Sequence, residues 1–77
     1  MNKNAKNKLD TVIDELQKIC DEIDDIKCEE NEKIDNMSDF VRQGERGQRI
    51  EEGVELMEKF QSEVKTCINT LYDLLVL

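Results

Sequence analysis

Apolar side chains recur at helical spacing from residue 9 to residue 37. With Leu9 assigned to position d of a heptad, three positions in every seven are apolar, which is the stripe width of a helix packed in a bundle. Lys27 and Glu30 interrupt the stripe, so residues 27–33 are predicted to be either a wetter layer of the bundle or a place where the helix leaves the core. The stripe consists of Leu9, Leu16, Ile23 and Met37 at d, Ile13, Cys20 and Ile34 at a, and Val12, Ile19 and Ile26 at g.

A second apolar stripe of the same kind runs from residue 50 to residue 77. Its rows are Ile50, Met57, Val64 and Leu71, then Gly53, Phe60, Cys67 and Leu74, with Val54, Ile68 and Leu75 widening the stripe. Neither half of the chain shows the alternation of a β-strand. Each stripe therefore predicts a helix of about 28 residues, or about 42 Å at 1.5 Å per residue.

The connection between the two stripes is short and contains turn-forming residues. Ser38 and Asp39 can start one short helical turn, and Gly44 is expected either in a left-handed conformation or as the N-cap of the second helix. A short link between equal helices favours an antiparallel hairpin. The predicted organisation is a flexible basic N-terminus at 1–7, a helix at 8–37, a turn at 38–46 and a helix at 47–76.

The predicted fold is all-α: an antiparallel hairpin of two long amphipathic helices that associates into a four-helix or larger bundle. A single partner helix cannot cover stripes this wide, and a chain of 77 residues has only a marginal core of its own. We therefore expect at least a homodimer, with the number of subunits left open. Gly53 either lets another backbone approach closely or is a tolerated helix glycine. The predicted core and interface residues are Leu16, Ile23, Ile50, Met57, Phe60, Val64, Cys67, Leu71 and Leu74.

Composition and charge exclude several kinds of function. The net charge of −8 argues against direct binding to nucleic acid or to an anionic membrane, and no apolar run is long enough to cross a bilayer. The acidic surface is either a solvated face or a decoy that imitates DNA. The chain has no histidine, so histidine-based catalysis and metal binding are excluded, and we expect no enzyme, metal or cofactor. The acidic run that begins at Asp21 lacks the glycine of a calcium loop.

Three cysteines stand at positions 20, 28 and 67. An odd number without a CxxC pair, and a polar N-terminus without a signal-peptide pattern, indicate free thiols in a cytoplasm. Cys20 and Cys67 lie on the apolar stripes and are expected to be buried as small hydrophobic side chains. Cys28 lies off the stripe and is expected to be exposed, with a regulatory role as the alternative.

All three arginines of the chain fall within residues 39–49 (DFVRQGERGQR), which we call the arginine turn. Arginine matches phosphate and carboxylate oxygens, a helix start offers free N–H groups, and bare glycines allow close approach. The alternative is structural pairing of the arginines with nearby acids, which stabilises little at the surface. The candidate anion site comprises Arg42, Gly44, Arg46, Gly47, Arg49 and Phe40.

The segment Asp35-Asn36-Met37, followed by Gly44-Glu45-Arg46-Gly47 between two acidic helices, resembles a group of short proteins encoded by bacteriophages and prophages. Members of that group read DNMPE, then a serine, then ERGE. Here Ser38 replaces the proline and Gly44 replaces the capping serine, and both replacements keep a helix-start role. The resemblance implies a phage origin, a helical hairpin and a location in the cytoplasm of a bacterial host. The group has no settled function.

Three hypotheses follow for the function. The first is a homo-oligomeric counter-defence protein that sequesters a nucleotide immune signal on the arginine turn or masks a host defence protein. The second is a DNA-mimicking inhibitor that uses the acidic faces. The third is a structural or assembly module that pairs its helices with a phage or host protein and binds no small molecule.

Overall fold

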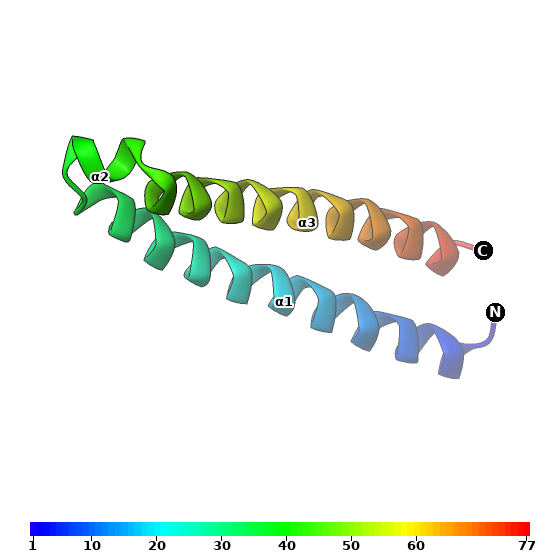
Figure 1. Cartoon of the computed structure of the whole chain (residues 1–77). Helices are drawn as coiled ribbons and strands as arrows, with labels where there is room; N and C mark the ends of the chain where they lie inside the picture. The colour runs from blue at the N-terminus through cyan, green and yellow to red at the C-terminus, as the bar shows by residue number, and fades with distance from the viewer.

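The structure is a computed structural model that describes residues 1–77 as three helices. α1 spans Lys3–Asp35, α2 spans Asp39–Gln43 and α3 spans Glu45–Leu75. Figure 1 shows α1 and α3 running antiparallel along each other, with α2 at the closed end and both termini at the open end. The molecule measures 58 × 15 × 12 Å. The predicted all-α antiparallel hairpin is confirmed.

α1 begins at Lys3, earlier than the boundary predicted at residue 8. The reason is a cap that the apolar pattern does not reveal: the side chain of Asn2 accepts a hydrogen bond from the N–H of Ala5 at 2.8 Å. Asparagine is among the best N-cap residues because it satisfies a donor that the helix leaves free. The segment 3–7 therefore forms the first turns of α1, although it contributes no apolar stripe.

α1 continues without a break through the segment 27–33 and ends at Asp35. Lys27 and Glu30 are half-buried at the seam, where the heptad pattern calls for apolar side chains. Of the two alternatives for this segment, the wetter layer is correct. Polar side chains with long apolar stems can fill such positions because the stem packs while the charged end reaches water.

The link between the long helices is built from two caps. Ser38 accepts a hydrogen bond from the N–H of Val41 and so starts α2, as its sequence position predicted. Gly44 is the N-cap of α3, with φ −78° and ψ −179°, and no residue of the chain has a positive φ. The N-cap alternative for Gly44 is therefore correct, the left-handed one is wrong, and α3 starts at Glu45 rather than at 47.

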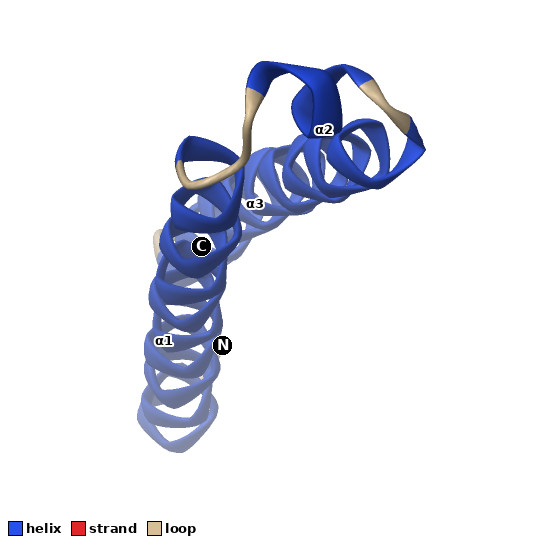
Figure 2. Cartoon of the chain, turned by 60° about the vertical axis from the view of Figure 1, so that its left-hand side comes forward, coloured by secondary structure: helices blue, strands red, loops and turns tan.

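Gly47 is buried where α2 packs over the first turn of α3 (Figure 2). A Cβ atom at this position would lie only 2.7 Å from both the carbonyl carbon and the Cα of Arg42. Main-chain atoms cannot yield as a flexible side chain does, so this close approach requires glycine. The glycine of the GERG sequence is thus explained by packing within the chain.

The core lies between the long helices. Ile13 and Cys20 of α1 form one buried cluster with Val64 and Ile68 of α3. It is thin: only seven of the 77 residues are buried, and none of the large side chains is fully enclosed. The partly buried side chains that flank the cluster are Leu16, Leu71 and Leu75.

The row of α3 that contains Phe60 and Cys67 points away from α1. Phe60 is 41% exposed and Cys67 is exposed. The row that faces α1 lies one residue further along the chain and includes Val54 and Ile68, and one residue corresponds to about 100° around a helix. The expected burial of Cys67 is therefore wrong within one chain, whereas the buried Cys20 and the exposed Cys28 are confirmed.

Substituting the two helical glycines with alanine is expected to have opposite effects. Gly47→Ala forces α2 away from α3 and is predicted to lower the free energy of unfolding by about 1–3 kcal/mol. Gly53→Ala is the matched control, because an added Cβ meets nothing within 4 Å. It should raise stability by about 0.5–1 kcal/mol, because alanine favours the helix. Urea denaturation followed by circular dichroism measures both, and equal effects would contradict the close-packing role of Gly47.

Candidate functional site

One side of the hairpin is lined by apolar side chains that nothing covers. On α1, Val12, Ile19 and Ile26 recur every seven residues and are 42%, 40% and 43% exposed. Each lies one residue before a seam position, so the row faces sideways from the hairpin. We call this surface, together with its counterpart on α3, the apolar face. Its members are Val12, Ile19 and Ile26 of α1 and Gly53, Phe60, Cys67 and Leu74 of α3.

The two rows of the apolar face belong to the same side of the hairpin. The opposite side is identified by a groove that Gln17 and Asp24 of α1 line together with Lys65 and Tyr72 of α3. Each helix has one row of side chains on either side of the seam, one residue before and one residue after the positions that face the other helix. In an antiparallel pair, the two rows that precede these positions lie on one side of the hairpin, and the two rows that follow them lie on the other. Because these polar rows share one side, the two apolar rows share the other.

The chain exposes more surface than a compact protein of its size. Its accessible surface is 5923 Å². A compact protein of 9.0 kDa exposes about 4,900 Å². The excess of about 1,000 Å² is similar to the ~800 Å² that each partner buries in a standard protein interface. An elongated hairpin with one apolar side therefore has an area that a partner can cover.

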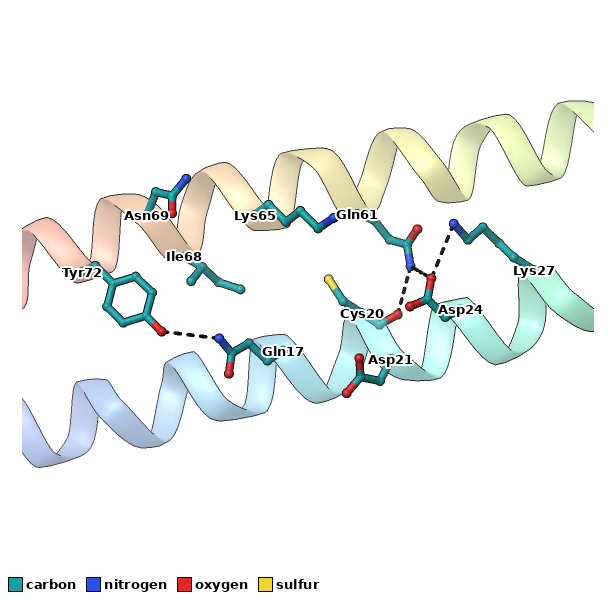
Figure 3. A pocket seen from close by; sticks show the side chains of 10 residues that line it. All are labelled: Gln17, Cys20, Asp21, Asp24, Lys27, Gln61, Lys65, Ile68, Asn69 and Tyr72. Atoms are coloured by element: carbon teal, nitrogen blue, oxygen red, sulfur yellow. Dashed lines mark hydrogen bonds and ion pairs between the residues drawn. The ribbon is translucent and has the colours of Figure 1, made fainter.

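The opposite side of the hairpin, which we call the polar face, is tied together by Gln61 (Figure 3). The buried side chain of Gln61 reaches from α3 to α1, where its amide nitrogen donates to the main-chain oxygen of Cys20 at 2.9 Å and to Asp24 Oδ1 at 2.7 Å. Lys27 Nζ lies 3.5 Å from the same carboxylate oxygen. The buried amide is thus satisfied, and it links the helices at one register.

The hydrogen bond from Gln61 is the main reason why the pKa of Asp24 lies below its ordinary value of 3.8. Partial desolvation opposes this shift, and attraction to Lys27 and Lys65 adds to it. All of these contacts favour the charged carboxylate. Asp24 therefore remains ionised at neutral pH and acts as an acceptor, not as a proton donor.

The rest of the polar face is an open groove in which acidic and basic side chains alternate. Tyr72 lies at its other end, where its hydroxyl accepts a long hydrogen bond of 3.4 Å from Gln17. Asp21 and Lys65 also line the groove. With carboxylates and ammonium groups in one open groove, the polar face has no preferred sign of ligand.

Arg42 does not point into an anion site. Its Nη2 donates to the main-chain oxygen of Ile34 at 3.1 Å, close to the end of α1. Its Nε is buried without a partner. The same Ile34 oxygen accepts from the N–H of Met37 at 3.1 Å. Carbonyl oxygens at a helix C-terminus attract cations, so Arg42 fastens α2 to the end of α1.

The other two arginines differ from each other. Arg49 Nη2 pairs with Glu45 at 2.6 Å, and both side chains are exposed. Arg46 is exposed and has no ion pair, and it lines a shallow hollow that also includes Lys33 and Arg49. Pairing with a nearby acid thus accounts for Arg49, and a main-chain hydrogen bond holds Arg42. Arg46 is the one arginine still available to a ligand.

The structure does not gather the candidate anion site into one cluster. Gly44 caps α3 and Gly47 packs against α2, so neither is a bare surface for a ligand. Phe40 is 88% exposed on α2, and the hollows that Arg46 lines do not include it. Only Arg46 and Arg49 remain together, with Lys33 as an additional cation that the sequence analysis did not select.

Gln61 was also missed from the sequence. Its position could have been found, because it interrupts a heptad row of apolar residues formed by Val54, Ile68 and Leu75. A single polar residue in such a row commonly fixes helix register and partner. That signal marks a structural role, which the hydrogen bonds of Gln61 bear out.

Comparison with known protein families, with curated proteins and with solved structures found no match to this chain. None of the three helices has the length and apolar character needed to cross a membrane. The two faces of the hairpin and the arginine turn are the features of the chain that bear on its function.

Replacing Gln61 with leucine is expected to raise the pKa of Asp24 toward 3.8, because the main interaction that favours the carboxylate is removed. The stability that this lowered pKa provides is fully present above pH 3.8 and is lost as the pH falls through the folded value. NMR titration of the Asp24 carboxyl carbon measures the shift. Gln17→Leu, on the same face but without a contact to Asp24, should leave that pKa unchanged, and an equal rise in both variants would contradict the assignment.

Arg42→Met and Arg46→Met should separate a structural arginine from a free one. Methionine retains most of the apolar stem, so the comparison isolates the guanidinium group. Loss of the Arg42 hydrogen bond is expected to cost about 1–2 kcal/mol of unfolding free energy. Arg46→Met should remain within about 0.5 kcal/mol of the parent protein. Thermal or urea unfolding measures the free energy of unfolding of both variants. A larger loss of stability for Arg46→Met than for Arg42→Met would show that Arg46 is structural.

Proposed function

We propose that this chain is a non-enzymatic binding protein that acts as a homo-oligomer. Its smallest form is two hairpins packed through their apolar faces into a four-helix bundle. The observation that supports this most strongly is that two apolar rows lie exposed on one side of the hairpin. These rows contain Val12, Ile19 and Ile26 on α1 and Phe60 and Cys67 on α3. A second copy offers the same wide stripe and therefore covers it along its full length.

The physical balance favours such packing. Burial of apolar surface contributes about 25 cal/mol per Å², so an interface of standard size offsets the cost of association. The polar face cannot serve as this interface, because covering Asp24 and Lys65 would remove charges from water.

We further propose counter-defence as the purpose of the oligomer, on the strength of the resemblance to phage proteins. The bundle would then sequester a nucleotide immune signal or mask a host defence protein. Arg46 supports the first form, since it has no ion pair and lies near Lys33 and Arg49. Native mass spectrometry with cyclic and linear nucleotides tests it: a stoichiometric adduct that is lost in Arg46→Glu supports sequestration, and no adduct in the parent protein overturns it.

A second candidate is the assembly module, which the same apolar face favours. In that case the face is covered by a phage or host protein rather than by a second copy. The molar mass of the purified chain separates the two candidates, because an assembly module with a foreign partner is a monomer on its own.

A new carboxylate on the apolar face should break the oligomer, whereas one on the neighbouring outer surface should not. Cys67→Asp and Thr66→Asp change exposed adjacent residues and each adds one negative charge. Burying an unpaired carboxylate costs several kcal/mol, so Cys67→Asp should weaken dimerisation by about 100-fold or more. Thr66→Asp should retain nearly the parent affinity.

Sedimentation equilibrium of the parent protein and of both variants measures this difference. Circular dichroism at high protein concentration checks that the helices remain. If both variants associate as tightly as the parent, the apolar face is not the interface. If the parent is a monomer at every concentration, the homo-oligomer itself is refuted.

A further inference from the structure

We infer that the two copies dock about a two-fold axis that runs along the hairpin, so that α1 of each copy lies over α3 of the other. Both arginine turns then lie at the same end of the bundle. This inference rests on the proposed homo-oligomer and specifies its geometry. It follows from the symmetry of the apolar face and from the charges at its edges.

A flat pair of antiparallel helices can stack on a copy of itself in only two symmetric ways. A two-fold axis along the helices places α1 over the partner's α3 and keeps the turns together. A two-fold axis across the helices places α1 over the other α1 and α3 over the other α3, with the turns at opposite ends. In both arrangements every neighbouring helix is antiparallel, so charge and shape must decide between them.

The edge of the apolar face along α1 is acidic. Lys8, four residues before Val12, is the one base of this edge. Glu15, Glu22 and Glu29 each follow a member of the apolar row by three residues, which makes them its neighbours on the helix surface. All three are exposed, and none belongs to an ion pair of the chain. Placing α1 over a second α1 would align two such unpaired acidic rows.

The edge of the apolar face along α3 is different. The corresponding positions are Arg49, Leu56, Glu63 and Thr70, with Leu56 65% exposed. This edge contains one acid and one base, and otherwise continues the apolar surface. Placing the acidic row of α1 beside it leaves Glu63 as the only acid opposite that row and lets Leu56 pack against the stems of the glutamates.

The closed end of the hairpin tolerates a neighbouring copy better than α1 does. Lys33 is already paired with Glu30 at 2.8 Å, and Arg49 with Glu45 at 2.6 Å. These internal pairs neutralise four of the local charges, and Arg46 remains as the exposed arginine without an ion pair. Bringing two turns together therefore opposes two cations, whereas crossing two α1 helices opposes six carboxylates.

The arrangement has a functional consequence. One end of the bundle would display two copies of Arg46 and two copies of the 88% exposed Phe40, and the other end would display neither. A ligand with two anionic groups or a two-fold partner would then find both contacts at one end. A bundle with opposed turns would hold the two Arg46 side chains nearly a hairpin length apart.

Pulsed electron–electron double resonance on the dimer tests the orientation. Spin labels are placed singly at the closed end by Gln43→Cys, at the open end by Asn4→Cys, and near the middle by Lys59→Cys, all at exposed positions. The background carries Cys20→Ala, Cys28→Ser and Cys67→Ser. Turns at one end predict interspin distances within about 35 Å at all three sites, the width of two helix layers plus labels.

If the turns lie at opposite ends, the interspin distances at Gln43→Cys and Asn4→Cys should be near the 58 Å hairpin length, and only Lys59→Cys should give a short distance. That result would overturn the inferred orientation but would still support a dimer. Absence of any dipolar signal at all three sites would refute the dimer itself.

Isotope-filtered NOEs on a mixed labelled and unlabelled parent protein provide a second measurement without substitutions. Contacts from Phe60 of one copy to the methyl groups of Ile19 and Ile26 of the other support the arrangement, and contacts from Phe60 only to the other α3 overturn it.

Discussion

Two helices packed against each other can shelter only a narrow strip of each surface, and this limit governs the whole molecule. Both long helices carry apolar stripes that are three positions wide, and the hairpin encloses only the part that faces the seam. The result is a core of four buried side chains in a molecule 58 Å long. The remaining apolar rows emerge together on one side. Covering that side is the main unmet physical requirement of the single chain, and it is the ground on which we propose association as the basis of its function.

The other side of the hairpin explains why the proposed association would use only one face. Gln61 occupies a buried position in a row of apolar residues, and its side chain bonds the main chain of Cys20 and the carboxylate of Asp24. These bonds hold the register and keep charged groups at the polar face in water. Because one face is polar and tied while the other is apolar and open, a second copy has one favourable side to dock on.

The sequence alone predicted the helix pair, the Ser38 start of α2 and the N-cap alternative for Gly44, because caps and heptad rows are local signals. It placed the start of α1 too late, since Asn2 acts as a cap without any apolar pattern. It assigned Cys67 to the buried side, because heptad spacing identifies a stripe but not which row of a wide stripe meets the neighbour. The packing role of Gly47 and the hydrogen bond from Arg42 to Ile34 could not be predicted from the sequence, because both depend on how α2 folds back across the helix ends.

The arginine turn illustrates the same limit for the candidate site. Three arginines and two glycines suggested one anion site, and the structure separates them: Arg42 and Gly47 hold α2 in place, Arg49 pairs with Glu45, and Arg46 is left free. Only contacts between distant parts of the chain could distinguish these roles. Any ligand function at this end therefore depends on Arg46 and, in the proposed homo-oligomer, on what a second copy would bring beside it.

The central claim is that the folded chain is stabilised by a second copy covering the apolar face. The most direct measurement is the thermal unfolding midpoint of the unmodified protein over a hundredfold range of protein concentration. Association of the folded state predicts a midpoint that rises steadily with concentration, because dilution favours separated and then unfolded chains. A midpoint independent of concentration, at a molar mass of 9.0 kDa, would contradict the claim.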